Sequence, residues 1–424
     1  MTGHQEHRPG DDADGRAADR APAGRRPPRL RWAARALPAA LIGAAALAGC
    51  GGPDLFLGGA PPSPEDAIRI VPADGARGVR ANGRLEVRVP AGRLERVEVH
   101  RALGGGRQPV AGRISRDGMI WRPLSDSLEL GARYTVDAVA LDGAGHRTTR
   151  HTAFATFAPA HRVIGFYSPE SGTTVGTGLI FSLVFNRPVG DRAAAERAIT
   201  VRARPAVEIA AHWFGHRRLD FRPRHRWRPG TRLTVRLRLR EVRTGPGAYG
   251  VQYKTLHYRV GRDQISVVDA ARHTLTVRRG GRVLAVLPVT AGDETNPTHN
   301  GAMVILERHA AIRMDGDTVG FGDAYDIPDV PHAMRLTRSG TFLHGNYWAA
   351  PEVFGGLNTS HGCVGLMDVR GGAPDTPAGW LYRNSIVGDT VEVRNSPDRT
   401  VAPDNGLGGW NMPWPAWRAG SALR

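Results

Sequence analysis

The sequence predicts a mainly β protein of several domains: two repeated β sandwiches, then a third β-rich domain that carries a candidate nucleophile. The chain has 424 residues, which is longer than one ordinary domain. Its 54 glycines and 31 prolines, together with few aromatic residues, indicate many short strands and turns rather than long helices. From about residue 66 onward, short segments alternate apolar and polar residues, as half-buried strands do.

The N-terminal residues predict an export signal. Residues 1–28 are polar, charged and proline-rich, and we expect them to be disordered. A basic segment at 29–35 precedes an apolar run at 36–49, which has the length of a signal-peptide core rather than of a membrane span. The run ends in Leu-Ala-Gly-Cys50, which resembles the lipobox of bacterial lipoproteins. This resemblance implies a diacylated Cys50 and stable anchoring; an ordinary secreted protein or an uncleaved anchor is the alternative.

The middle of the chain contains an internal repeat. Trp121-Arg122-Pro123 leads to Gly131 and a strand-like run, and Phe221-Arg222-Pro223 leads to Gly230 and a similar run. The offset of about 100 residues is close to the size of one immunoglobulin-like (Ig-like) sandwich. We therefore expect a linker at 51–65 and Ig-like domains at 66–159 and 160–262.

The candidate nucleophile is Cys363, because the only other cysteine is Cys50. It ends the segment Ser360-His361-Gly362-Cys363 and follows His344 by 363 − 344 = 19 positions. A thiolate is a strong nucleophile, and a nearby imidazole can take its proton. Gly362 allows a tight turn that exposes main-chain N–H groups to a developing oxyanion. The pattern predicts cysteine acyl transfer, whereas a Cys50–Cys363 disulfide would remove the nucleophile.

A histidine-glycine pair followed by Ser-His-Gly-Cys resembles the signature of the L,D-transpeptidases, whose catalytic domain is of the YkuD type. The resemblance runs from residue 263 to 395, and the tail resembles the C-terminal extension of actinobacterial members. Those members also place Ig-like modules before the catalytic domain. We therefore expect a catalytic domain at 263–395 and a tryptophan-rich extension at 396–424. Trp410, Trp414 and Trp417 are too many to expose freely, so we expect them to pack on the catalytic domain.

The resemblance implies a role for each residue of the site. Cys363 is the nucleophile, as a thiolate, and His344 is the general base. The main-chain carbonyl of Gly345 fixes the histidine tautomer, and the N–H groups of Cys363 and Gly362 form the oxyanion hole. His361 is structural or orients the substrate. Gly365 stands where the family usually has asparagine. The other expected substrate-binding residues are Ser360, Trp348, Tyr347, Met314 and Arg338, and no metal or organic cofactor is implied.

The implied reaction joins two peptidoglycan stem peptides. Cys363 attacks the carbonyl of the third residue of a tetrapeptide donor, D-alanine leaves, and an amine of the acceptor stem resolves the thioester into a 3→3 cross-link. Carbapenems are expected to acylate the same cysteine. The alternatives are an L,D-carboxypeptidase, a protein-to-wall ligase, a non-catalytic wall-binding lipoprotein, and a zinc site built from His344, His361 and Cys363.

The formal net charge of +17, almost all of it from arginine, has two interpretations: a solvated surface or attraction to a polyanion. The sequence carries no nucleic-acid-binding motif, so we expect no nucleic acid partner. We expect the protein on the outer face of the cell membrane, held by Cys50 and acting on the wall. Its Ig-like domains would then be spacers or wall-binding modules.

Overall fold

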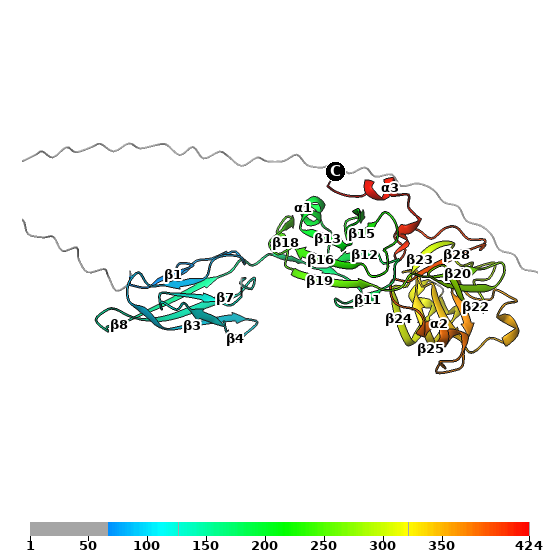
Figure 1. The fold of residues 1–424 in the computed structure, drawn as a ribbon, viewed down its shortest axis with the longest axis horizontal. Coiled ribbons are helices and arrows are strands. Elements are labelled where there is room, and N and C mark those ends of the chain that lie inside the picture. Colours follow the sequence, from blue (N-terminus) through cyan, green and yellow to red (C-terminus); the bar gives the residue numbers. More distant parts are fainter. Residues whose placement is uncertain (1–66, 126, 321, 424) are drawn as a thin grey trace, which may run out of the picture. The chain divides into compact units, whose positions relative to one another are not determined.

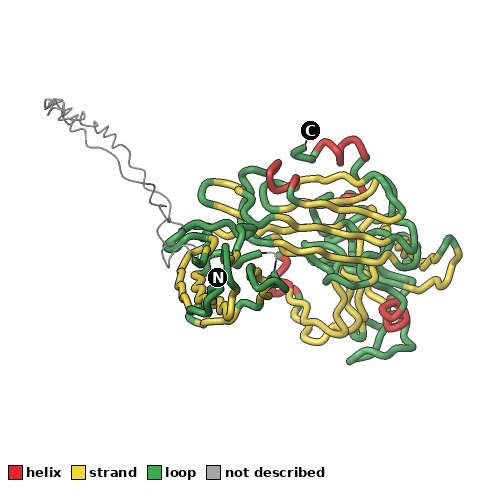
Figure 2. Tube along the Cα trace, turned by 60° about the vertical axis from the view of Figure 1, so that its left-hand side comes forward, coloured by secondary structure: helices red, strands yellow, loops and turns green. Residues whose placement is uncertain are grey.

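The computed structural model describes residues 67–125, 127–320 and 322–423. Strands dominate these residues, which confirms the predicted mainly β fold (Figure 2). The predicted signal segment, Cys50 and the linker at 51–65 lie outside the described residues. Within the described ranges, no helix is both long and apolar enough to cross a bilayer.

The first sandwich packs two four-stranded sheets around one core (Figure 1). Strand β7 alternates buried and less buried residues along its length, so one of its faces lines the core. Tyr134 on β7 stacks on Phe154 with ring centroids 5.0 Å apart. The sheets are β1 (Arg69–Val71), β2 (Glu86–Arg88), β6 (Ile120–Pro123) and β5 (Gly112–Ile114), and β4 (Gly106–Pro109), β3 (Arg93–Leu103), β7 (Arg133–Leu141) and β8 (Arg147–Ala155).

The second sandwich repeats this arrangement and adds a small third sheet and helix α1 (Arg192–Arg197). Its sheets are β10 (Gly165–Phe166), β12 (Phe181–Phe185), β15 (Arg218–Pro223) and β14 (Ile209–Phe214); β11 (Thr174–Val175), β19 (Tyr253–Val260), β16 (Arg232–Arg238) and β13 (Ile199–Arg204); and β17 (Arg243–Gly245), β18 (Ala248–Gly250) and β9 (His161–Val163).

The sequence repeat has a structural basis. β6 and β15 are each the third strand of a four-stranded sheet, and each buries an aromatic residue, Trp121 or Phe221. Each strand is followed by a glycine with positive φ, 71° at Gly131 and 82° at Gly230. Glycine adopts this conformation without steric cost. The matching tripeptides therefore mark equivalent strands of the two sandwiches.

The third β domain consists of a five-stranded sheet, a four-stranded sheet and helix α2 (Pro377–Arg383). Gly280 and Gly281 form the hairpin turn between β21 and β22, with φ of 54° and 80°. The sheets are β22 (Arg282–Pro288), β21 (Thr274–Arg279), β20 (Gln264–Asp269), β28 (Thr390–Arg394) and β23 (Gly301–Val304), and β24 (Glu307–Asp315), β25 (Asp326–Arg335), β26 (Phe342–Asn346) and β27 (Val364–Met367).

One strand pair of this domain brings distant residues together. β26 and β27 are parallel neighbours in which Leu343 pairs with Val364 and His344 with Gly365. The interior-facing parts of both strands are apolar and buried, which fixes the register. Cys363, which directly precedes β27, therefore lies beside the strand that carries His344.

The C-terminal extension corrects one expectation. Trp417, on helix α3 (Trp414–Ala419), is fully buried in the core of the second sandwich, and its indole N–H donates to Ala210 O at 3.0 Å. Trp410, on η4 (Gly408–Asn411), donates to Gly178 O at 2.7 Å. The tryptophans that we expected on the catalytic domain thus make these contacts with the second sandwich, whereas Asn411, also on η4, exchanges hydrogen bonds with Ala302 of β23 in the catalytic domain at 2.8 and 2.9 Å. The extension therefore joins both domains, and its Val401 enters the core of the catalytic domain.

The reason for this packing is a buried arginine. The Arg222 guanidinium lies 4.9, 5.2 and 4.6 Å from the rings of Trp410, Trp414 and Trp417. Burial lowers the pKa of Arg222 to about 10. Cation–π contacts of this kind are strongest where water is excluded. The tryptophans of the extension therefore cover Arg222, which lies on β15 of the second sandwich.

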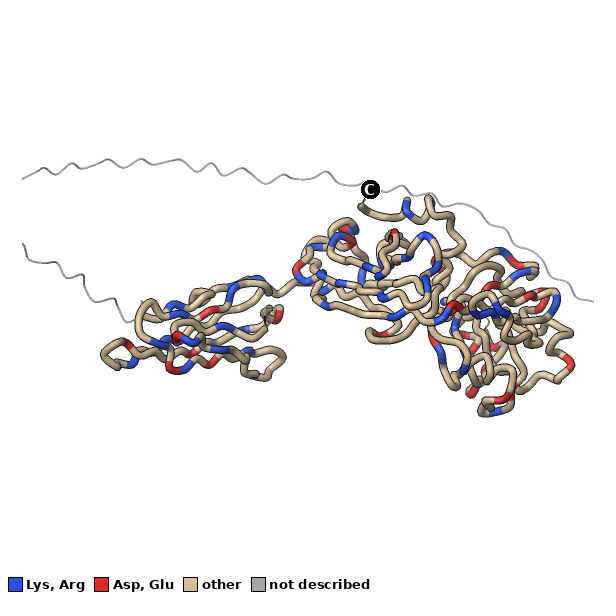
Figure 3. Tube along the Cα trace, viewed as in Figure 1, with Lys and Arg blue, Asp and Glu red and all other residues tan. Residues whose placement is uncertain are grey.

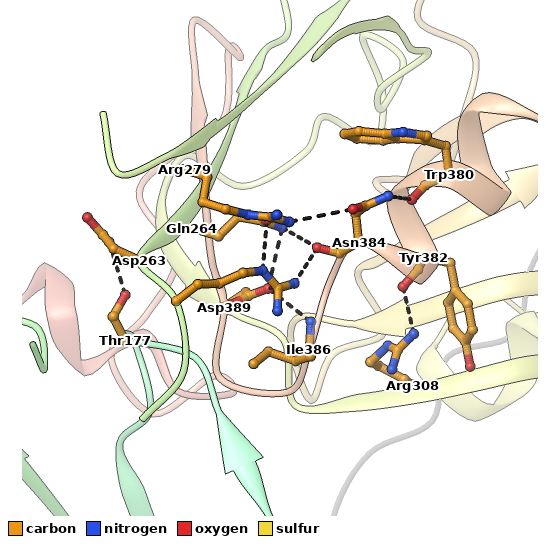
Figure 4. A network of polar contacts seen from close by, with 11 residues as sticks. Thr177, Asp263, Gln264, Arg279, Arg308, Trp380, Tyr382, Asn384, Ile386 and Asp389 are labelled. Atoms are coloured by element: carbon orange, nitrogen blue, oxygen red, sulfur yellow. Dashed lines mark hydrogen bonds and ion pairs between the residues drawn. The ribbon is translucent and has the colours of Figure 1, made fainter. Parts of the chain in front are cut away.

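A buried polar network includes Gln264, the first residue of β20, and Asp389, which directly precedes β28 (Figure 4). Gln264 Oε1 accepts a hydrogen bond from Arg279 at 2.8 Å. Asp389 Oδ2 accepts from the Ile386 N–H at 2.9 Å and lies 3.5 Å from Arg262. Burial raises the pKa of Asp389 to about 6, and the Ile386 hydrogen bond and nearby arginines offset this only in part. The domain therefore contains a carboxyl group that titrates near neutral pH.

Candidate active site

A cavity of about 330 Å³ contains most of the predicted site. Its walls come from β26, the segment before β27, and the hairpin formed by β24 and β25. A small cavity with a few polar groups converging on it is a typical binding or active site. Six of the predicted residues line it: Cys363, His344, His361, Ser360, Trp348 and Met314.

The side chain of His344 is buried and its orientation is fixed by a hydrogen bond. Its side chain is 5% exposed, and its Nδ1 lies 3.0 Å from Gly345 O, to which it donates, leaving Nε2 as an acceptor. Burial lowers the pKa of His344, and the bond to Gly345 only partly opposes this. The imidazole is therefore neutral at neutral pH. The Trp348 ring stacks on it at 5.7 Å with an interplanar angle of 12°.

Gly345 can only be glycine here. A Cβ at this position would lie 2.2 Å from Oδ2 of Asp368, whose side chain is fully buried and hydrogen-bonded to His332 at 2.7 Å. A larger residue would push the carbonyl that orients His344 away from its place. The backbone at Gly345 thus lies tightly between the imidazole of His344 and the buried carboxylate of Asp368.

Cys363 rests as a thiol. Its Sγ lies 3.4 Å from Gly340 O, to which it donates. Burial raises the pKa of the thiol from 9.0 to about 11, while a hydrogen bond from Phe342 and the charge of Arg335 lower it less. The thiolate expected from the sequence is therefore the reacting form and not the resting form. A base must remove the proton during attack.

The hydroxyl group of Ser360 holds the segment 360–363 in place. Ser360 Oγ donates to Cys363 O at 2.6 Å and accepts from Gly362 N–H at 3.2 Å. Gly362 has a φ of 106°, which residues with a Cβ rarely adopt. The Gly362 N–H is thus engaged within the loop, which distinguishes it from the Cys363 N–H as an oxyanion donor.

The hairpin of β24 and β25 forms one wall of the cavity, and of its residues the sequence analysis identified only Met314. Met314 on β24 pairs with Ile327 on β25, and both line the cavity. Tyr325 completes this wall, with its ring centroid 5.4 Å from that of His361. Burial, together with the charges of Cys363 and Asp315, raises the pKa of Tyr325 to about 12. Prolines within β25 hid its alternating pattern.

Three of the predicted substrate-binding residues do not line this cavity. The Tyr347 hydroxyl donates to Asp329 at 2.5 Å. Arg338 lines a different cavity, of about 430 Å³, in which Arg218 also lies. Gly365 exchanges backbone hydrogen bonds with Thr290 at 2.8 and 3.0 Å. Within the described residues, no group of three or more His, Cys, Asp and Glu side chains is placed to hold a metal ion.

The fold and the site together define a class: a cysteine acyltransferase whose catalytic domain follows Ig-like modules. The bacterial Ig domain family matches residues 76–243, and the YkuD L,D-transpeptidase catalytic domain matches residues 263–393. The chain belongs to the L,D-transpeptidase family, and the enzyme is an L,D-transpeptidase. The family predicted from the motif is thereby confirmed.

Two curated relatives match most of the chain. L,D-transpeptidase 2 of Mycobacterium tuberculosis (strain CDC 1551 / Oshkosh) is 35% identical over 414 residues, covering 95% of this chain and 98% of the relative. L,D-transpeptidase 5 of M. tuberculosis (strain ATCC 25618 / H37Rv) is 29% identical over 400 residues, covering 93% and 85%. The solved structure of LD transpeptidase LdtMt1 in complex with imipenem is 30% identical, with a TM-score of 0.46, over 56% of this chain and 100% of that one.

Proposed function

We propose that this L,D-transpeptidase cross-links peptidoglycan stem peptides by acyl transfer through Cys363, with His344 as the base. The observation that carries the proposal is the shared cavity: the partly buried thiol of Cys363, directly before β27, and the neutral, oriented imidazole of His344 on the parallel strand β26 both line it. Both groups are uncharged at rest, so proton transfer accompanies attack.

The first half of the reaction forms the thioester. His344 Nε2 takes the thiol proton as Sγ bonds to the carbonyl carbon of the third residue of the donor stem. The Cys363 N–H stabilises the oxyanion. When the intermediate collapses, the C–N bond to D-alanine breaks, and the leaving nitrogen takes the proton from His344.

The second half releases the product. The side-chain amine of an acceptor stem attacks the thioester while His344 accepts its proton. The C–S bond then breaks, the sulfur regains a proton from His344, and a 3→3 cross-link remains. Water in place of the amine would give a carboxypeptidase, and a protein amine would give a protein-to-wall ligase. Carbapenems present a strained carbonyl to the same thiol and are the covalent inhibitors we expect.

The test compares wild type, Cys363→Ala and Cys363→Ser, all beginning at Gly51. Intact mass after incubation with a carbapenem should show one adduct on the wild type and none on Cys363→Ala. With disaccharide-tetrapeptide muropeptides, the wild type should release D-alanine and form 3→3 dimers. A folded wild type without an adduct would overturn acyl transfer, and free tripeptide without dimers would favour the carboxypeptidase.

The proposed location rests on the lipobox-like segment ending at Cys50. A diacylated Cys50 would hold the enzyme on the outer face of the membrane, with the two sandwiches as spacers. Arginines are spread over the described chain and interleaved with acidic residues, which supports a solvated surface (Figure 3). Labelling with a radioactive fatty acid should mark the full chain and not Cys50→Ala, and equal labelling of both would refute the anchor.

A further inference from the structure

Asn346 lies in the cavity beside the proposed catalytic pair. It ends β26, two residues after His344, so the two side chains lie on the same face of the strand. Its side chain is 6% exposed and lines the cavity together with Cys363. A buried amide needs partners for both its oxygen and its nitrogen, because an unpaired buried polar group is costly.

The oxygen end of Asn346 is fully used. Oδ1 accepts hydrogen bonds from the N–H groups of Trp348 at 3.1 Å and Ala349 at 3.0 Å. Two N–H donors identify this atom as the oxygen, so the opposite atom is Nδ2. The bonds hold the segment that places the Trp348 ring on His344. Asn346 therefore fixes one side of the cavity through its carbonyl.

The Nδ2 group of Asn346 can still donate a hydrogen bond to a ligand. Among the residues that the structure describes, none accepts a hydrogen bond from Nδ2. A Cβ at residue 365 would stand 3.0 Å from Thr290 Cγ2 and 3.4 Å from both the Cβ and the Nδ2 of Asn346. Because residue 365 is glycine, the amide keeps this space. The position of the Asn346 amide therefore depends on the absence of a side chain at residue 365.

We propose that Asn346 is a substrate-binding residue whose Nδ2 donates a hydrogen bond to a carbonyl or carboxylate oxygen of the acyl donor. This rests on the proposed function, since the donor stem is the peptide that occupies the cavity. Peptide stems carry many acceptor oxygens and few donors other than amide N–H groups, so a fixed side-chain donor suits them. Asn346 selects the register in which the scissile carbonyl meets Cys363.

Asn346→Asp separates the two ends of the side chain. The carboxylate keeps an acceptor for Trp348 and Ala349 but removes the donor, whereas Asn346→Ala removes both. Three quantities are measured for each purified variant: kcat/KM for D-alanine release from disaccharide-tetrapeptide, the rate of Cys363 alkylation by iodoacetamide, and Tm. The alkylation rate corrects for any effect of the new charge on the thiol.

We expect the ratio of D-alanine release to alkylation to fall about 10- to 100-fold in Asn346→Asp, as loss of one buried hydrogen bond implies, and at least as far in Asn346→Ala, which also loses the bonds to Trp348 and Ala349. Asn346→Asp should keep a wild-type Tm. The double variant Asn346→Ala with Gly365→Asn returns an amide from the neighbouring strand and should regain activity. A wild-type ratio in Asn346→Asp would overturn the proposal, as would a well-folded double variant that regains nothing. A wild type that releases no D-alanine would instead refute the proposed function.

Discussion

The elevated pKa of Cys363 determines how the reactivity of this thiol depends on pH. Burial raises the pKa from 9.0 to about 11, a difference of about two, so the thiolate fraction at neutral pH is about 100-fold below that of an ordinary thiol. At pH 7 the thiolate makes up roughly one part in 10⁴. Iodoacetamide reacts with the thiolate. Its rate with Cys363 should therefore rise about tenfold per pH unit from pH 7 to 10 without a plateau.

The assay follows the intact mass of protein beginning at Gly51, so that Cys363 is the only thiol. Cys363→Ala gives the background. His344→Ala should keep the same slope, because alkylation of a thiolate needs no general base, although D-alanine release should be lost. A plateau below pH 8 in the wild type would reveal a preformed thiolate–imidazolium pair. That result would refute the inference that burial keeps both groups neutral.

Three further predictions concern single residues. Gly345→Ala places a Cβ 2.2 Å from Asp368, so D-alanine release should fall at least about tenfold while iodoacetamide alkylation changes little; equal loss in both assays would contradict a role in orienting His344. Trp417→Ala should lower the free energy of unfolding by about 3–5 kcal/mol, measured by urea titration, because the ring is fully buried; a loss below about 1 kcal/mol would show that the extension is dispensable for the second sandwich. Asp389 has a folded pKa of about 6, above its unfolded value of about 3.9, so its contribution to stability is present below pH 4 and is lost as pH rises through 6. Asp389→Asn should therefore show a smaller drop in Tm than the wild type between pH 4.5 and 7.5, and an unchanged drop would contradict the assigned burial effect.

Local patterns predicted much of this protein. Strand alternation, the repeated tripeptides and the Ser-His-Gly-Cys motif depend on neighbouring residues, so they can be read from the chain directly. The position of the tryptophans could not, because the sequence does not show that Arg222 lies inside a sheet and needs aromatic cover. The role of Gly365 could not be predicted from the sequence either. The space that Gly365 leaves is next to Asn346 of the adjacent strand, and only the register of β26 and β27 shows that these two residues are neighbours.

The extension also affects how the chain matures. Trp417 completes the core of the second sandwich from a position 207 residues beyond the strand residue to which it binds. During synthesis, that sandwich therefore emerges long before its last core residue. It reaches full stability only after the whole catalytic domain has followed. A chain that stops before residue 417 would contain every residue of the active site, but its second sandwich would lack one core side chain. Full stability of the second sandwich therefore requires the complete chain.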